Sequence, residues 1–221
     1  MTATSPPDGA RPSAATPYVL PFAIFVVLTE LGRWVPGSVV WIYPVKTLVA
    51  AALMWRFRAS YPELRWESRH AALAVGVGVL VLGLWIPLSH ERLSLATPIA
   101  VNAWGLAGAW GWPWVIVRLL GSALVVPVME ELFWRSFLPR YLINPDFERV
   151  PLGVFTVWSL LISVALFGVE HNQWVAGIMA GLAYAWLLRH TRSLPACILA
   201  HGVTNGLLGA YVLATGAWQF W

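Results

Sequence analysis

Three groups of polar residues interrupt an otherwise apolar chain, and their side chains together could catalyse hydrolysis. They are Glu130-Glu131 with Arg135, His171 four residues after Phe167, and His201 four residues before Asn205. A carboxylate and an imidazole can together take a proton from water, and a second imidazole with an amide can donate hydrogen bonds to the oxyanion of a tetrahedral intermediate. The three groups therefore predict an amide hydrolase that uses no protein nucleophile.

The first group ends an apolar run, and its spacing separates the roles of the two carboxylates. On a helix, Glu131 and Arg135 stand at i and i+4 and can pair, whereas Glu130 points about 100° away. Pro127 lies just before them and tends to kink the helix, which opens room for water near Glu130. We expect Glu131 to be compensated and structural and Glu130 to face a cavity. Alternatively, the pair marks the membrane boundary, with Arg135 in the headgroup layer.

The other two groups also have plainer interpretations. Phe167 and His171 share a helix face, and a histidine at a helix end is often only a hydrogen-bonded cap. His201 and Asn205 share a face inside an apolar segment, where they could instead bond a neighbouring helix. The functional interpretation is favoured because three separate apolar segments each supply an uncommon polar group. A membrane fold tolerates such groups best where they meet.

The composition places these residues in a membrane. Of the 221 residues, 59% are hydrophobic and only 11% are charged, which is outside the usual range of a soluble domain. Apolar segments close to the about 20 residues of a membrane-spanning helix lie at 18–35, 39–55, 71–88, 114–134, 152–169, 174–188 and 195–214, with a weaker one at 95–112. We expect an all-α, polytopic integral membrane protein of about seven to eight transmembrane helices with an intramembrane active-site cavity.

We expect one transmembrane helical domain at 18–221, with its catalytic core at about 114–214, after a disordered tail at 1–17 that is rich in Pro, Ser, Ala and Thr. With seven spans, ten arginines fall on the side of the N-terminus and two on the other, so the N-terminus is predicted to be cytoplasmic. Lys46 and Arg118 remain inside predicted spans. The arginines are scattered through short loops, so we expect no nucleic-acid partner.

These residues also resemble a family, the CAAX-protease and bacteriocin-processing membrane peptidases, whose motifs are Glu-Glu-x-x-x-Arg, Phe-x-x-x-His and His-x-x-x-Asn. All three motifs occur here in that order, within about 127–207. The resemblance implies a glutamate-dependent intramembrane endopeptidase. Its implied site comprises Glu130 and His171 to activate water, His201 and Asn205 as the oxyanion site, Glu131 and Arg135 as supporting residues, and Phe167 as a substrate contact.

One departure from the family pattern is Ser136, which stands where many members have glycine, so local packing is expected to differ. The compact chain is also similar to the CAAX-like proteins that accompany exosortase sorting systems, which implies a multi-pass protein of the bacterial inner membrane. Bacteria generally lack prenylated CAAX proteins. The expected partners are therefore the lipid bilayer and a membrane-associated protein or peptide substrate, with no cofactor and no metal.

Two other functional classes stay open. A zinc-dependent membrane hydrolase could use His171, His201 and Glu130 as metal ligands with Glu131 as the base, although no HExxH helix supports it. A non-catalytic, immunity-type membrane scaffold could keep the same pocket to bind a peptide.

The predicted spans leave one conflict of depth. A helix that starts at Leu152 carries His171 about 28 Å across the membrane, whereas His201 lies only about 9 Å beyond Pro195 on the inner side. The two imidazoles meet only if the first helix begins later, near Trp158, if helices tilt strongly, or if the link at 170–174 is re-entrant.

Overall fold

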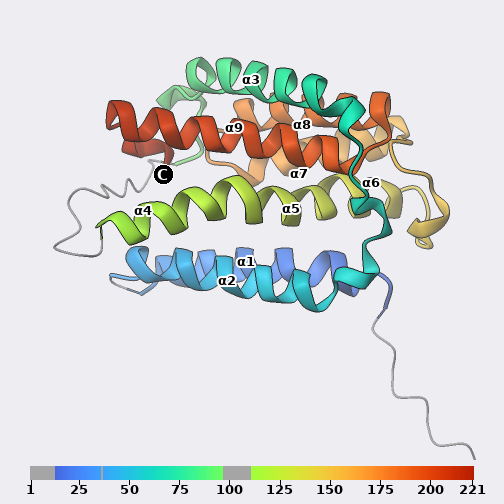
Figure 1. The fold of residues 1–221 in the computed structure, drawn as a ribbon, viewed down its shortest axis with the longest axis horizontal. Coiled ribbons are helices and arrows are strands. Elements are labelled where there is room, and N and C mark those ends of the chain that lie inside the picture. Colours follow the sequence, from blue (N-terminus) through green and yellow to red (C-terminus); the bar gives the residue numbers. More distant parts are fainter. Residues whose placement is uncertain (1–12, 36, 97–110) are drawn as a thin grey trace, which may run out of the picture.

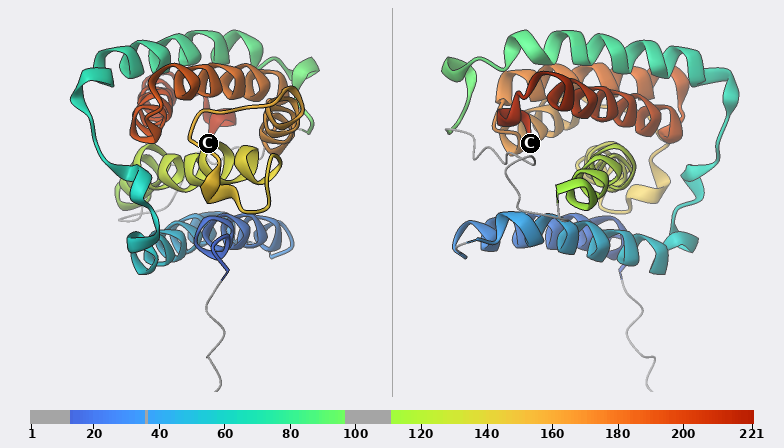
Figure 2. Two further views of the ribbon diagram at one scale, coloured as in Figure 1. Left: turned by 90° about the vertical axis from the view of Figure 1, so that its right-hand side faces the viewer. Right: turned by 60° about the vertical axis from the view of Figure 1, so that its left-hand side comes forward.

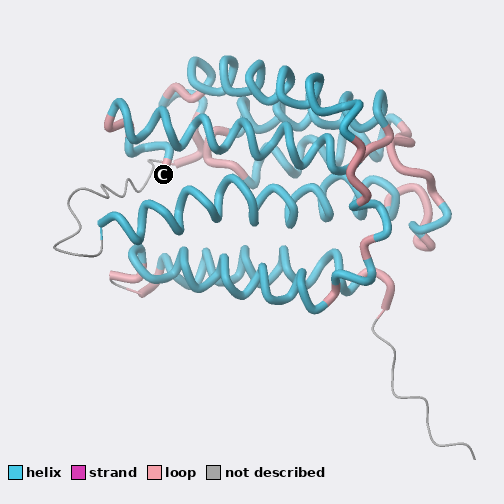
Figure 3. The backbone as a smooth tube through the Cα atoms, viewed as in Figure 1, coloured by secondary structure: helices cyan, strands magenta, loops and turns pink. Residues whose placement is uncertain are grey.

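The computed structural model describes residues 13–35, 37–96 and 111–221, and every regular element in these ranges is helical (Figures 1 and 3). The main helices are α1 (Thr16–Arg33), α2 (Val39–Arg56), α3 (Ala71–Leu88), α4 (Gly111–Leu120), α5 (Val126–Glu131), α6 (Leu138–Tyr141), α7 (Val157–Glu170), α8 (Trp174–Thr191) and α9 (Leu194–Thr215). The all-α prediction is therefore confirmed. Residues 1–12 of the expected tail and most of the expected segment at 95–112 lie outside the described residues.

The apolar character of these helices suits a bilayer. Within the described residues, three helices are both long and apolar enough to cross a membrane, at Thr16–Arg33, Ser68–Leu88 and Leu194–Thr215. Large apolar side chains lie on outer faces, among them Leu80 on α3 and Leu31 on α1. Such surfaces are costly in water and favourable in lipid, so the fold is that of a polytopic membrane protein. The count of about seven to eight spans stays a prediction.

The helices are arranged in three layers that all views show (Figures 1 and 2). The antiparallel pair α1 and α2 forms the lower layer in Figure 1, and α3, α7, α8 and α9 form the upper one. Between them runs a long helix that comprises α4, α5 and α6. It contacts α1 and α2 on one side and α9 on the other, so it brings residues of both outer layers to a common centre.

The long helix contains two π-helical stretches, η7 (Gly121–Val125) and η8 (Leu132–Phe137), on either side of α5. In η7 the hydrogen bonds run from i to i−5, as in the bond from Val126 N–H to the carbonyl of Gly121. The next residue is Pro127, which has no N–H to give, so the carbonyl of Ser122 loses its partner in this pattern. The proline thus leaves a backbone acceptor available to another helix.

The helix α7 begins at Val157, and this later start reduces the conflict of depth. Thr156 is its N-cap: the Ser159 N–H donates to the Thr156 hydroxyl at 3.1 Å, and the Thr156 N–H donates to the Ser159 hydroxyl at 2.9 Å. The expected helical start at Leu152 was wrong, and a later start near Trp158 is confirmed. A helix of 14 residues rises about 21 Å instead of about 28 Å, and His171 at its end lines the same cavity as His201.

Candidate active site

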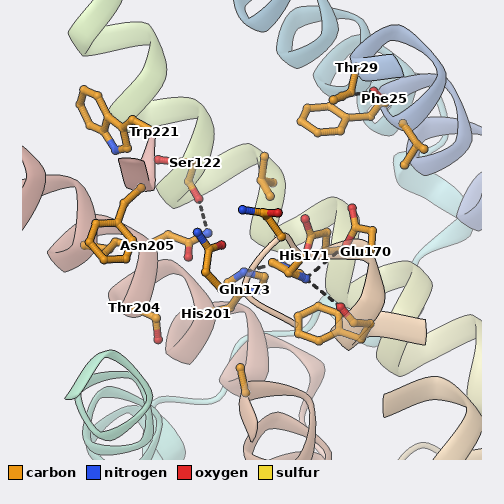
Figure 4. Close-up of a pocket in the computed structure, with 18 of the residues that line it drawn as sticks. Phe25, Thr29, Ser122, Glu170, His171, Gln173, His201, Thr204, Asn205 and Trp221 are labelled. Carbon is orange, nitrogen blue, oxygen red and sulfur yellow. Dashed lines mark hydrogen bonds and ion pairs between the residues drawn. The ribbon is translucent and has the colours of Figure 1, made fainter. Parts of the chain in front are cut away.

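A cavity of about 360 Å³ lies between the layers and is lined by α1, α2, the long helix, α7 and α9. The predicted residues that line it are Glu130, Phe167, His171, His201 and Asn205. Figure 4 shows His171, His201 and Asn205 on one side of this space and Phe25 and Thr29 of α1 on the other. The three polar groups of the sequence therefore do converge, although they come from three separate helices.

Glu130 is the buried carboxylate of the cavity, with only 5% of the residue exposed. Its Oε2 lies 4.0 Å from His201 Nε2 and makes no hydrogen bond to the described residues. A carboxylate oxygen, a ring nitrogen and a second carboxylate oxygen from Glu130, His171 and Glu170 all lie within 4.8 Å of one another. Glu130 therefore stands within reach of a water molecule that both imidazoles could also contact.

Glu131 lies behind the cavity wall and is fully buried. His201 Nδ1 lies 2.9 Å from its Oε1, and Arg135 Nε lies 3.3 Å from its Oε2. The predicted i, i+4 pair of Glu131 with Arg135 is therefore confirmed. Because neither Glu131 nor Arg135 lines the cavity, the two adjacent carboxylates do occupy different environments, one beside open space and one between two cation-forming groups.

His171 is the C-cap of α7, and its ring is oriented by its own helix. Its Nδ1 lies 2.8 Å from the carbonyl oxygen of Phe167, so Nδ1–H donates there and Nε2 is left without a proton in the neutral ring. The Phe167 ring packs against both imidazoles, with centroid distances of 4.6 Å to His171 and 6.3 Å to His201. Since Phe167 is only 1% exposed, it mainly holds the two rings apart at a fixed spacing.

Asn205 reaches the backbone acceptor that Pro127 leaves open. Its Nδ2 donates to the carbonyl of Ser122 at 2.9 Å, a bond drawn in Figure 4. An amide nitrogen carries two hydrogens, so one remains to donate into the cavity. On α9, His201 lies four residues before Asn205, and the two side chains face the same space.

Two features of the cavity were missed by the sequence reasoning. The three motifs do not include Glu170, yet it lies beside Glu130 and His171. Lys46 and Arg118 were noted only as charges inside predicted spans, and both line the cavity. The signal that could have found Lys46 was its position near the centre of an apolar segment, since ionisable groups there usually serve a site.

The cavity is lined by ionisable residues and lies among helices that are apolar enough for lipid. These features place the chain in the class of polytopic membrane proteins with a buried polar site. Residues 110–207 match the family model described as type II CAAX prenyl endopeptidase Rce1-like. The chain therefore carries an Rce1-like domain, and the family predicted from the three motifs is confirmed, because all three lie inside the match. Assignment to the exosortase-associated subgroup stays a prediction.

One curated relative shares a shorter stretch with this chain. Over 80 residues the chain is 36% identical to a UPF0182 protein of Bifidobacterium adolescentis. That stretch is 36% of this chain and 7% of the other protein, so the chain spans a small part of the length of this relative. No solved structure matches the chain.

Proposed function

We propose that this protein is an intramembrane endopeptidase that hydrolyses a peptide bond of a membrane-associated protein or peptide with water activated by Glu130 and His171. One observation carries the proposal: the Glu130 carboxylate, whose Oε2 has no hydrogen-bond partner among the described residues, lines the same cavity as the two imidazoles and the Asn205 amide. This set contains an acid-base pair and two hydrogen-bond donors, which peptide hydrolysis requires. The Rce1-like domain at 110–207 supports the same class of reaction.

In the proposed first step, Glu130 takes a proton from a water molecule that also donates a hydrogen bond to His171 Nε2. This nitrogen is the acceptor because Nδ1–H is held by the Phe167 carbonyl. The resulting hydroxide adds to the carbonyl carbon of the substrate and forms a tetrahedral intermediate. Collapse of the intermediate breaks the C–N bond, and protonated Glu130 returns the proton to the departing amine.

His201 and Asn205 are proposed to stabilise the oxyanion of that intermediate. His201 Nδ1–H donates to Glu131, so its Nε2 can donate to an oxyanion only when the ring carries both protons. Glu131 stabilises that imidazolium, and Arg135 balances the remaining negative charge of the carboxylate. Asn205 supplies the second donor with the hydrogen that Ser122 does not use. We assign Phe167 a positioning role beside its predicted contact with substrate.

A metal-dependent hydrolase is the second candidate, and one observation favours it. Glu130, Glu170 and His171 each offer a ligand atom within 4.8 Å of the others, and two carboxylates with an imidazole suit zinc. This set differs from the one expected from the sequence, because Glu170 stands in place of His201, whose Nδ1 is bonded to Glu131. In that case the metal would supply a bound hydroxide at neutral pH, and Glu170 would be indispensable.

A cleavage assay separates these candidates. Wild type, Glu130→Gln, Glu170→Gln and Asn205→Ala would be purified in detergent, matched for unfolding temperature, and incubated with a library of lipid-anchored peptides in excess chelator. We expect cleavage by wild type and Glu170→Gln, none by Glu130→Gln, and turnover lowered about 10²- to 10³-fold by Asn205→Ala. Activity that chelator removes, zinc restores and Glu170→Gln abolishes would favour the metal. Undiminished biological function of Glu130→Gln would instead indicate the peptide-binding scaffold.

We further propose a multi-pass location in the bacterial inner membrane with a cytoplasmic N-terminus. The uneven distribution of arginine supports this orientation. So does the contact of Tyr18, near the start of α1, with Tyr61 in the arginine-rich connection between α2 and α3. A reporter enzyme that is active only in the cytoplasm should be active when fused to the N-terminus, and inactivity of that fusion would reverse the orientation.

A further inference from the structure

Lys46 on α2 faces the same cavity from the wall opposite the motif residues. The residue is 8% exposed, and its ammonium donates to the Thr29 hydroxyl at 2.7 Å and lies 4.2 Å from the centroid of the Phe25 ring. Figure 4 shows Phe25 and Thr29 on the side away from His201 and Asn205. The proposed hydrolysis gives this buried ammonium no role.

A second cation, Arg118 of the long helix, lies close to Lys46. Its guanidinium carbon is 4.0 Å from the centroid of the Tyr43 ring, and Lys46 Nζ is 5.3 Å from the same centroid. Among the residues whose side chains are described, no carboxylate lies within 4.0 Å of the charged nitrogens of either cation. Because a buried charge without a counter-ion is costly, this wall of the cavity is prepared for an anion.

The buried charges of the cavity therefore form an acidic group and a basic group. The carboxylates of Glu130 and Glu170 gather near His171, whereas Lys46 and Arg118 lie by α1 and α2. Along the long helix, the backbones of Arg118 and Glu130 are at most about 18 Å apart at 1.5 Å per residue, because the π-helical stretch η7 between them rises less. An extended peptide covers that distance in about five residues. A chain bound for cleavage at Glu130 can thus place a nearby group at the cations.

We propose that Lys46, assisted by Arg118, binds a carboxylate of the peptide substrate within about five residues of the cleaved bond. The carboxylate belongs either to the free C-terminus of the peptide or to an aspartate or glutamate side chain. This inference rests on the proposed function. It goes further because it assigns a specificity subsite to residues that lie outside all three motifs.

Peptide binding tests the subsite without requiring turnover. In the Glu130→Gln protein, three fluorescent N-palmitoylated decapeptides of alanine, valine and leucine would be titrated: one with a free C-terminus, its C-terminal amide, and the amide with one aspartate near the C-terminus. We expect at least one carboxylate peptide to bind about 10- to 100-fold more tightly than the plain amide. Lys46→Met should remove this preference, and Lys46→Arg should keep it.

Arg33 provides the matched control, since it also lines the cavity but is exposed and pairs with Glu30 at 3.0 Å. Arg33→Met removes the same charge and should leave the preference unchanged. The plain amide reports on folding of each variant. Equal binding of all three peptides, no binding of the carboxylate peptides, or equal weakening of all three by Lys46→Met would overturn the subsite. Wild-type cleavage of the same peptides tests the proposed hydrolysis separately, so the two ideas can fail independently.

Discussion

At the scale of single residues, the state of His201 depends on Glu131. The carboxylate is fully buried and lies between His201 Nδ1 at 2.9 Å and Arg135 Nε at 3.3 Å. It therefore fixes which ring nitrogen carries a proton and turns Nε2 toward Glu130 and the cavity. The guanidinium of Arg135 also lies 4.2 Å from the centroid of the Phe167 ring. The pair of Glu131 and Arg135 therefore contacts the side chain that separates His171 from His201.

Glu131→Gln should lower kcat about 10²- to 10⁴-fold with little change in KM, because an uncharged amide neither fixes the ring nor stabilises its doubly protonated form. Steady-state kinetics over a range of pH would check this. We expect the basic limb of the kcat profile to move to lower pH, since the doubly protonated His201 ring that donates to the oxyanion loses its counter-ion. A loss of active protein with an unchanged kcat and pH profile would mean that Glu131 is only structural.

The sequence predicts contacts within a helix better than contacts between helices. The pair of Glu131 with Arg135 follows from i, i+4 spacing alone, and so does the shared face of His201 and Asn205. The approach of Glu170 to Glu130 depends on how α7 packs against the long helix, which no local pattern specifies. The same limit applies to cavity-lining residues supplied by the N-terminal helices.

At the scale of helices, the site depends on a close approach of α9 to the π-helical stretch η7. A Cβ atom added at Gly202 would lie 2.7 Å from the carbonyl oxygen of Ala123, closer than real Cβ contacts. A Cβ atom at Gly206, one turn further along α9, would lie 3.6 Å from Ala123 Cβ, an ordinary contact. The glycine at 202 therefore lets Asn205 reach the Ser122 carbonyl.

Gly202→Ala should push α9 away from η7, which weakens the bond of Asn205 and lowers turnover by about tenfold or more, with a loss of about 1–3 kcal/mol in stability. Gly206→Ala adds the same methyl group on the same helix where space exists, so its stability should change little or rise slightly. Unfolding in detergent and kcat would be measured for both. Equal effects of the two substitutions would refute the close approach as the cause.

Helix positions were largely predictable from apolarity, but their irregularities were not. The apolar run from Leu152 continues into α7, so hydropathy alone placed the start too early; the capping pair of Thr156 and Ser159 sets the real one. Hydropathy also does not predict the π-helical stretches, because they change the backbone hydrogen bonds and leave the side-chain pattern apolar. Pro127 predicted an irregularity in the helix. The structure shows its consequence, which is that the Ser122 carbonyl accepts a hydrogen bond from Asn205 of α9.

At the scale of the whole molecule, one carboxylate ties the layers together at the arginine-rich end. Glu63, in the connection between α2 and α3, accepts from the Tyr18 hydroxyl of α1 at 3.2 Å, bonds the Ser136 hydroxyl, and lies 3.5 Å from the Arg140 guanidinium. Ser136 thus gives the departure from the family glycine a structural role. Nearby, burial and the charge of Glu63 raise the pKa of Tyr61 to about 12, so Tyr61 stays a neutral donor in this end of the bundle.

Glu63→Leu should destabilise the protein by about 3–5 kcal/mol, because it leaves the buried Arg140 guanidinium without its counter-ion. The double variant Glu63→Leu with Arg140→Met should cost less than the two single variants added together, since it leaves no unpaired charge. Chemical unfolding of the four proteins in one detergent gives the coupling energy, and purely additive losses would contradict a tie between layers. Neither residue lines the cavity, so kcat per folded molecule should change little. The fold would then have two separate groups of buried charged residues. Glu63 and Arg140 hold the layers together at one end, and the residues that line the cavity are available for catalysis.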